Sequence, residues 1–225
     1  TLDFASLYPS IMLCWNLSFD TIVFGQQHAQ EQGLTTDDYE QSPNGYLFVR
    51  HSKHKGLLPN ILDQLLSTRK LAKKAMANAK DPFTKDIMNG RQLALKVCAN
   101  SVYGYTGAAF SNYPCRGISS SVTAYGRKLI YDTKDYVEQH YAPCKVVYGD
   151  TDSVMIKFPP GTSVEDAIKG AKRMEEEINP RLYRTPVFIE YEKVFCPYLL
   201  MKKKKYAGFK YENDSTRGKM DQLLE

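Results

Sequence analysis

Two aspartates set two residues apart, Asp150 and Asp152, are the side chains of this sequence best suited to metal chemistry. They lie in the segment YGDTDS at 148–153, between apolar runs at 146–147 and 154–156. Apolar runs on both sides of a Gly-Asp pair are typical of a β-hairpin with a tight turn. Carboxylates crowded on a rigid turn repel each other, so the arrangement usually needs a cation. Taken alone, the pair is explained equally well as a solvated polar turn.

A third aspartate, Asp3, ends the apolar opening of the chain and is followed by FASLYPS at 4–10. One interpretation is an N-cap aspartate before a helical turn. The alternative is that Asp3 joins the hairpin aspartates in one site, far from them in sequence but close in space.

Two helices predicted between these aspartates carry polar side chains in register. Arg69 and Lys73 are four residues apart and share a face of the first helix. Lys96, Asn100 and Tyr103 share a face of the second helix at i, i+4 and i+7. Each of these could be a solvated surface residue. Together, cations on two helices and carboxylates on a sheet would make a site for a metal-bound polyphosphate.

The hydrophobic periodicity predicts the elements that position these residues. Leucines and an isoleucine recur at helical spacing from Leu57, and Asp81-Pro82 ends this helix. A second helix follows to Tyr103, which gives an antiparallel pair. The other expected elements are strands at 1–4, 46–49, 186–191, 198–201 and 206–209, a polar surface excursion at 25–45, a turn at 104–111, and helices at 119–141 and from 163.

The composition is that of an ordinary globular protein, with 225 residues, 43% hydrophobic and 24% charged. No apolar run approaches the roughly 18 residues that span a bilayer, so no membrane partner is expected. The five cysteines are scattered without a C-x-x-C pair, which favours core residues over a zinc site or disulfides. The net charge of +5, concentrated in runs such as Lys202–Lys205, favours anionic partners. The chain opens on Thr1 without a methionine, so we expect a fragment of a longer protein.

At this point the sequence resembles family B DNA polymerases. The matching segments, in the family's order, are 3–10 (DFASLYPS) for motif A, 91–95 (RQLAL), 96–104 (KVCANSVYG) for motif B, 148–153 for motif C and 203–206 (KKKY) for the K-K-[RK]-Y element. The resemblance covers nearly the whole chain. The motif sequences are most similar to those of the delta-type replicative enzymes and their counterparts in large DNA viruses.

The resemblance implies an α+β fold. A polymerase palm, which is an antiparallel sheet with packed helices, would be interrupted by a fingers helical hairpin. The first part of the palm would be residues 1–56 with a surface insertion at about 25–45, the fingers 57–103, and the second part of the palm 104–225.

The resemblance also implies a metal site. Asp3 and Asp150 would bridge two Mg²⁺ ions, and the main-chain carbonyl of Phe4 would complete the coordination. Asp152 would lie beside the pair and contribute field and hydrogen bonding more than ligation. Glu190 and Glu192 could lie nearby, but they are better explained as surface carboxylates of a strand.

The remaining roles follow from the same resemblance. Lys96 would grip the triphosphate and protonate the departing pyrophosphate, and Tyr8 would leave no room for a ribose 2′-hydroxyl. The full set for dNTP binding is Ser6, Leu7, Tyr8, Arg69, Lys73, Lys96, Asn100 and Tyr103. The set for primer-template DNA is Thr151, Lys203, Lys204 and Tyr206.

The predicted activity is that of a DNA-directed DNA polymerase, with primer-template DNA and dNTPs as partners. A sliding clamp, accessory subunits, and a nucleus or viral replication site are further implications of the resemblance. Two alternatives remain. A catalytically inactive polymerase-like scaffold is disfavoured by the intact Asp3, Asp150, Lys96 and Asn100. An RNA-making or reverse-transcribing palm enzyme is disfavoured by Tyr8 and the wording of motif B.

Overall fold

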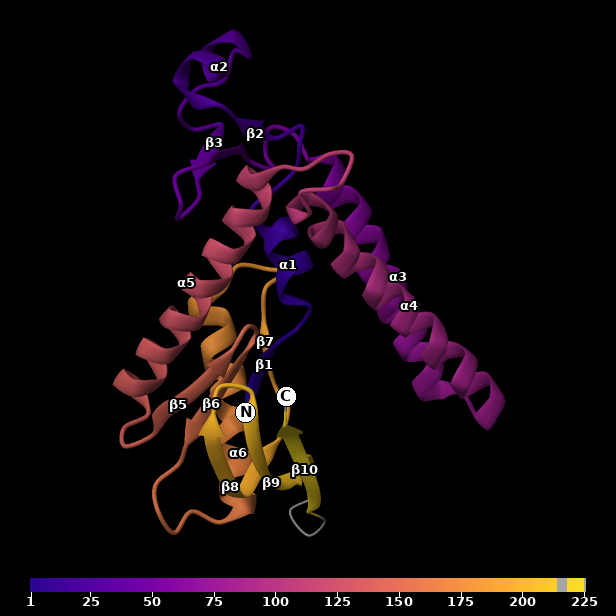
Figure 1. The fold of residues 1–225 in the computed structure, drawn as a ribbon, viewed down its shortest axis with the longest axis vertical. Helices are drawn as coiled ribbons and strands as arrows, with labels where there is room; N and C mark the ends of the chain where they lie inside the picture. The colour runs from indigo at the N-terminus through magenta and orange to yellow at the C-terminus, as the bar shows by residue number, and fades with distance from the viewer. Residues whose placement is uncertain (214–217, 225) are drawn as a thin grey trace. The chain divides into compact units, whose positions relative to one another are not determined.

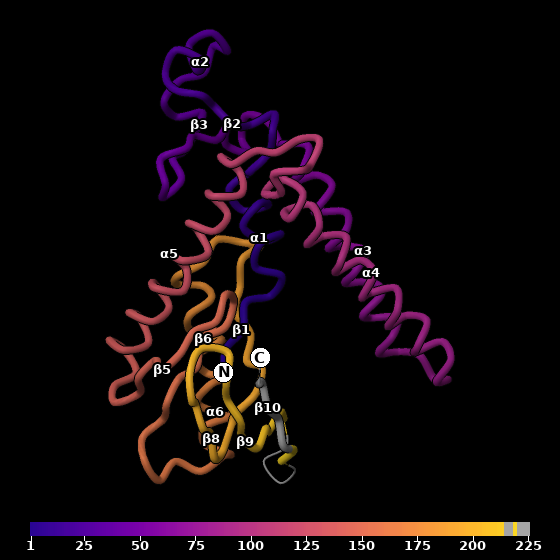
Figure 2. Tube along the Cα trace, viewed as in Figure 1, coloured from indigo at the N-terminus to yellow at the C-terminus, as the bar shows by residue number. Residues whose placement is uncertain are grey.

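The computed structural model describes residues 1–213 and 218–224. The chain divides into two compact units, one of Thr1–Ala5 with Arg127–Glu225 and the other of Ser6–Gly126. Each unit is described by itself below. Its elements can be followed in Figure 1, and the chain trace in Figure 2. The fold is α+β, as the sequence predicts. In the described part of the chain, no helix is long and apolar enough to cross a membrane.

The first unit contains a four-stranded antiparallel sheet with the order β5-β6-β1-β7. Its strands are β1 (Leu2–Phe4), β5 (Lys145–Asp150), β6 (Ser153–Lys157) and β7 (Ile189–Tyr191). Leu2, Val154 and Ile189 are fully buried, so apolar side chains of three strands form the core of this unit.

Two helices belong to this unit, wholly or in part. Helix α6 (Val164–Leu182) buries one face, which includes the predicted Ile168, Ala171, Met174 and Ile178. Ser163 caps this helix by accepting a hydrogen bond from the Asp166 N–H at 3.1 Å. Helix α5 (Arg116–His140) contributes its residues 127–140.

A second antiparallel sheet follows in the same unit, with the order β10-β9-β8. It consists of β8 (Val194–Lys202), β9 (Lys205–Tyr211) and β10 (Lys219–Leu224). The predicted strands at 198–201 and 206–209 are therefore present and longer than expected. Their connection is a two-residue turn in which Lys204 has a left-handed φ of 60°.

The second unit contains the predicted antiparallel helical hairpin, formed by α3 (Leu57–Asn78) and α4 (Pro82–Gly107). Asp81 caps α4, because its carboxylate accepts a hydrogen bond from the Thr84 N–H at 2.8 Å and Pro82 occupies the first turn. The expected turn at 104–111 is wrong at its start. Gly104 and Gly107 keep a helical backbone, since neither adopts a positive φ, and so α4 continues.

A small lobe occupies residues 22–49 of this unit. It contains β2 (Ile22–Val23), α2 (Gly25–Glu31), β3 (Tyr39–Gln41) and β4 (Leu47–Val49), with the strand order β2-β4-β3. The surface excursion expected at 25–45 therefore contains a helix, α2, and a strand, β3, that the sequence did not predict. Val23, Ala29 and Val49 form a core that is small because the segment has few apolar residues.

Helix α1 (Leu7–Cys14) precedes the lobe in the same unit. Two side chains between α1 and the lobe, those of Asn16 and Ser18, form hydrogen bonds to the backbone at the start of α3. The buried Asn16 side chain donates to the carbonyls of Val49 and His54 at 2.7 and 2.8 Å. Its oxygen accepts from the Gly56 N–H at 2.8 Å, and Ser18 accepts from the Leu58 N–H. These bonds satisfy N–H groups that a helix start leaves without partners.

Replacing Asn16 should therefore destabilise the protein. Asn16→Ala leaves buried backbone groups unpaired and places alanine at a left-handed φ of 55°. We expect the free energy of unfolding, measured by urea denaturation, to fall by about 2–4 kcal/mol. Asn60→Ala is the matched control, because Asn60 is exposed and donates one 3.3 Å bond to Lys55. Equal losses in the two variants would contradict the role of Asn16.

Candidate active site

A row of polar side chains crosses one face of the four-stranded sheet in the first unit. Asp3 of β1 is paired with Ser153 of β6 on one side and with Glu190 of β7 on the other. Ser153 is paired in turn with Asp150 of β5. Directly paired residues point to the same face of a sheet. Leu2 is buried on the opposite face, so the row of Asp150, Ser153, Asp3 and Glu190 lies on the more open side.

The hairpin turn that carries the motif aspartates is fixed to β1. Thr151 adopts a left-handed φ of 56°, and the Asp152 N–H donates to the Asp150 carbonyl at 2.6 Å. The Phe4 N–H donates to the Asp152 carbonyl at 2.7 Å. Asp152 is therefore next to β1, whereas β6 separates Asp150 from β1 by two strand spacings, roughly 10 Å.

The turn between β8 and β9 places a lysine against Asp150. The Lys204 N–H donates to the Tyr148 hydroxyl at 3.0 Å, and Lys204 Nζ lies 3.6 Å from Asp150 Oδ2. The side chain of Asp150 is 25% exposed and that of Lys204 is 55% exposed, so water screens the pair. A basic residue thus offsets the charge of one motif aspartate. This contact could not be predicted from the sequence.

Aromatic packing supports the same turn. Tyr206 lies 5.7 Å from Phe195 and 5.6 Å from Tyr198, measured between ring centroids. The Tyr198 hydroxyl donates to Met155 Sδ at 2.9 Å. Burial, followed by the neighbouring Tyr206 and Tyr148, raises the pKa of Tyr198 to about 12, so its hydroxyl stays neutral.

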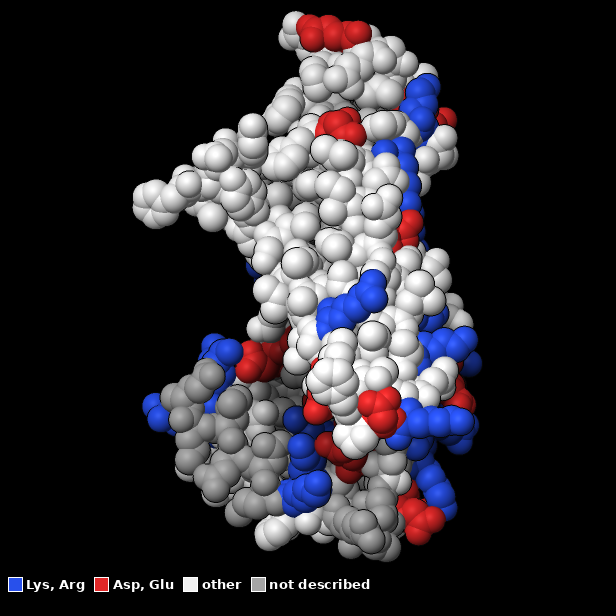
Figure 3. Space-filling view, turned by 90° about the vertical axis from the view of Figure 1, so that its right-hand side faces the viewer, with Lys and Arg blue, Asp and Glu red and all other residues white. Residues whose placement is uncertain are grey.

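A second group of predicted residues lies in the second unit. Arg69 of α3 donates from Nη1 to Ser6 Oγ at 2.9 Å and from Nε to Gln92 Oε1 at 3.4 Å. These contacts fix a guanidinium beside the start of α1. Lys73 and Lys96 are exposed on the α3–α4 hairpin. Figure 3 shows one face of the molecule, with Lys and Arg side chains interspersed with Asp and Glu.

Two predicted tyrosines of this unit form one contact. The rings of Tyr8 and Tyr103 lie 4.4 Å apart between centroids and are tilted by 54°. Burial and then the adjacent Tyr8 raise the pKa of Tyr103, so the Tyr103 hydroxyl remains neutral near pH 7. The structure therefore joins Ser6 with Arg69 and Tyr8 with Tyr103, whereas Asn100 is exposed on α4.

The chemistry of the carboxylates suits a hard divalent cation. Carboxylate oxygens are the ligands that Mg²⁺ prefers, usually one or two from the protein, completed by water and substrate phosphates. Among the described residues, no group of three or more His, Cys, Asp or Glu side chains is close enough to hold a metal. The ammonium of Lys204 beside Asp150 shows that a cation is accommodated here. The donor set therefore fits a metal whose coordination a bound substrate completes.

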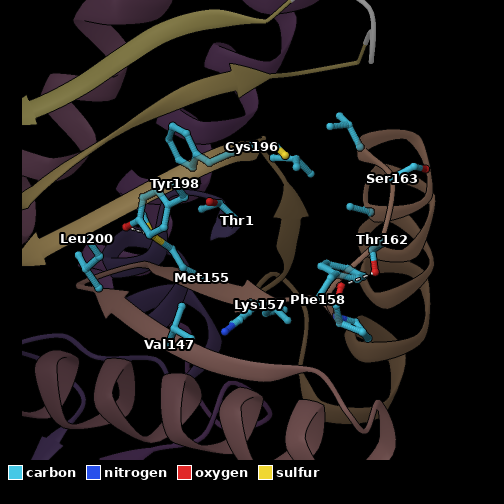
Figure 4. Close-up of a pocket in the computed structure, with 16 residues that line it drawn as sticks. Thr1, Val147, Met155, Lys157, Phe158, Thr162, Ser163, Cys196, Tyr198 and Leu200 are labelled. Carbon is cyan, nitrogen blue, oxygen red and sulfur yellow. Dashed lines mark hydrogen bonds between the residues drawn. The ribbon is translucent and has the colours of Figure 1, made fainter.

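A cavity of about 430 Å³ in the first unit is a separate feature. Figure 4 shows its apolar lining, with Val147, Met155, Phe158 and Leu200 around it. None of the predicted site residues lines it. This cavity and the carboxylate row are therefore different places.

Sequence reasoning undervalued one carboxylate. Glu190 falls in a predicted strand and alternates with the buried Val187 and Ile189, so its outward orientation could be predicted. Its neighbour could not be predicted, because pairing with Asp3 depends on the strand order.

Comparisons with known proteins agree with these motifs. The model of the family described as DNA polymerase family B matches residues 1–222. The DNA polymerase delta catalytic subunit of Candida albicans is 48% identical over 98% of this chain and 22% of its own length. That of Caenorhabditis elegans is 47% identical over 98% of this chain and 21% of its own. The chain thus spans about a fifth of these relatives.

A solved structure is also similar. The family B DNA polymerase from the hyperthermophilic archaeon Pyrobaculum calidifontis matches with a TM-score of 0.70 and 28% identity. The match covers 99% of this chain and 26% of that chain.

The contact between Lys204 and Asp150 predicts an effect on cation binding. Lys204→Met removes a positive charge beside the carboxylates, so Mn²⁺ should bind about fivefold more tightly to the complete polypeptide that contains residues 1–225. Electron paramagnetic resonance of free Mn²⁺ measures this affinity. Lys203→Met is the control, because Lys203 is exposed and one residue away. Equal effects of the two variants would show that only net charge matters.

Proposed function

Because the chain belongs to DNA polymerase family B, we propose that it carries the nucleotidyl-transfer site of a DNA-directed DNA polymerase. The reaction joins a dNTP to the 3′-hydroxyl of a primer and releases pyrophosphate. The observation that best supports it is the sheet register, in which Asp3 and Asp150 are both paired with Ser153. We propose residues 57–103 as the fingers, and 1–56 with 104–225 as the palm.

The proposed cofactor is a pair of Mg²⁺ ions held by the aspartates and by the main-chain carbonyl of Phe4. When bound, such ions activate the primer hydroxyl and neutralise the leaving pyrophosphate. The chain's part is to hold the carboxylates rigidly on one sheet, which the bond from the Phe4 N–H to Asp152 supports.

The two motif aspartates take different roles in this proposal. The sequence favours Asp150 as the ligand, and the shared face of Asp3 and Asp150 supports that choice. One observation favours Asp152 instead. Its carbonyl accepts a hydrogen bond from the Phe4 N–H, which holds Asp152 next to the strand of Asp3. We therefore assign direct ligation to Asp3 and Asp152, and to Asp150 the positioning of Lys204.

The cations of the helical hairpin would bind the triphosphate. Arg69 binds phosphate oxygens in a bidentate manner, and Lys73 and Lys96 act as point charges. Arg69 is already oriented by Ser6, so less side-chain entropy is lost on binding. Lys96 protonates the pyrophosphate as it leaves. The backbone N–H groups of Ser6 and Leu7 add donors at the start of α1.

Both sets of residues act on one bound nucleotide in this proposal. Asn100 positions the nucleotide, and the packed rings of Tyr8 and Tyr103 form the wall of the sugar and base-pair pocket.

The primer-template would lie along the β8–β9 turn. Thr151, Lys203, Lys204 and Tyr206 would contact its minor groove, where the pattern of donors and acceptors is degenerate and suits a check of pairing shape. This binding is largely electrostatic and weakens with salt. We also propose that this polymerase works with a sliding clamp and accessory subunits, in the nucleus or at a viral site of replication.

The proposed division between the aspartates can be tested by three amide substitutions in the complete polypeptide. Asp3→Asn and Asp152→Asn should each lower dNTP incorporation by about 100- to 1000-fold, because each removes charge needed in the transition state. Asp150→Asn should lower dNTP incorporation by only about 10-fold, since it frees Lys204. Single-turnover primer extension gives the rates.

Glu176→Gln is the control for this series, because Glu176 is an exposed carboxylate of α6. Affinity for primer-template should change little in Asp3→Asn, Asp152→Asn and Glu176→Gln. Greater damage from Asp150→Asn than from Asp152→Asn would reverse the two roles. Full activity in Asp3→Asn would remove the polymerase proposal and favour an inactive scaffold.

The proposed sugar gate predicts a change in nucleotide selection. Tyr8→Ala removes the ring beside Tyr103, so ribonucleotide incorporation relative to deoxyribonucleotide should rise by about 10- to 100-fold. Tyr8→Phe keeps the ring and should keep the discrimination. Ratios of kcat/KM for matched nucleotide pairs measure it. An unchanged ratio in Tyr8→Ala would place the gate elsewhere.

A further inference from the structure

A loop at the end of α4 presents aromatic side chains to solvent. We define the aromatic loop as residues 105–114. Phe110 is fully exposed, Tyr113 is 69% exposed and Tyr105 is 47% exposed. Large exposed rings gathered in one short segment are typical of a binding surface rather than of an ordinary loop.

The aromatic loop is held at both ends by hydrogen bonds. The Cys115 N–H donates to the Thr106 carbonyl at 2.9 Å, which closes the loop onto α4. The Asn112 N–H donates to the Tyr105 hydroxyl at 3.4 Å, and the Ser111 N–H to the Ala108 carbonyl at 3.1 Å. Compact loops with joined ends are frequently functional. The exposed rings therefore project from a backbone that is already ordered.

The charge around the aromatic loop indicates the kind of partner. Residues 97–126, which surround the loop in sequence, contain no Asp or Glu and include Arg116. A segment without acidic residues that exposes aromatic rings is suited to a binding partner that is a polyanion with flat faces for stacking. Single-stranded nucleic acid has both properties, because every base presents a π-face and every linkage carries a negative charge.

Another part of the same unit provides a contrast. Phe24 is 68% exposed, and the surrounding residues 20–40 contain Asp20, Glu31, Asp37, Asp38 and Glu40 with neither Lys nor Arg. A ring in this acidic segment is unsuited to DNA. Exposed rings alone therefore do not distinguish the aromatic loop from residues 20–40. Exposed rings in a segment without carboxylates do.

We propose that Phe110 and Tyr113 of the aromatic loop stack on unpaired bases of the template strand. This rests on the proposed polymerase function, in which Tyr103, two residues before Tyr105 and on the same helix, lines the pocket for the new base pair. The loop thus follows directly on that pocket in sequence. Stacking would bind the single-stranded template whatever its sequence.

The test compares two DNA substrates with the complete polypeptide that contains residues 1–225. Both have the same primer duplex, and the template overhang is either one nucleotide or about ten nucleotides long. Phe110→Ala and Tyr113→Ala should each weaken binding of the long-overhang DNA by about 5- to 100-fold. Binding of the short-overhang DNA should remain within about twofold of wild type.

Variants separate stacking from other effects. Phe110→Trp should keep the affinity, and Phe110→Leu should lose it although the side chain stays apolar. Phe24→Ala is the matched control and should change neither affinity. The fluorescence of 2-aminopurine in the overhang should be quenched by wild type and by Phe110→Trp, and less by Phe110→Ala.

Several results would overturn the inference. These are equal losses on the two substrates, full affinity in Phe110→Ala, or full affinity in Phe110→Leu. Incorporation of one nucleotide on the short-overhang DNA distinguishes the two proposals. If wild type incorporates it and the overhang effect is missing, only the stacking inference fails. If wild type incorporates nothing, the polymerase proposal fails.

Discussion

Repulsion between carboxylates fixed on one sheet is the constraint on which the proposed site depends. Two unit charges roughly 10 Å apart near a protein surface still interact by about 1.7 kcal/mol, and on flexible chains they would simply separate. Here the register prevents this, because Asp3 and Asp150 flank the same residue, Ser153. The opposite face is held by buried Leu2 and Val154. The hydrophobic core therefore supplies the rigidity that keeps like charges together, and a cation becomes the natural partner.

The need for a cation beside these carboxylates explains the position of Lys204. Its ammonium lies beside Asp150, and its backbone is anchored on the Tyr148 hydroxyl. The same turn belongs to the segment proposed to contact the primer-template. A lysine that neutralises a carboxylate and also meets DNA must share its charge between them. Binding of metal and binding of DNA are therefore expected to be linked through this residue.

The sequence predicted the helices better than the pairings. Leucines at helical spacing located α3, and Asp81-Pro82 marked the junction with α4, because these signals are local. The same local reasoning missed α2 and β3, which a core as small as Val23, Ala29 and Val49 stabilises. It also missed the partners of Asp150 and Glu190. Those depend on which strands become neighbours, and a linear pattern does not contain strand order.

The residue types in the two proposed DNA-binding segments imply two kinds of affinity. Contacts of Lys203 and Lys204 with phosphates release counterions, so they weaken steeply as salt rises. Stacking on Phe110 and Tyr113 involves neutral rings and depends little on salt. At high ionic strength the share of binding due to the aromatic loop should therefore grow. A polymerase needs such a division, because the duplex must slide along its charged contacts while the next template bases stay ordered.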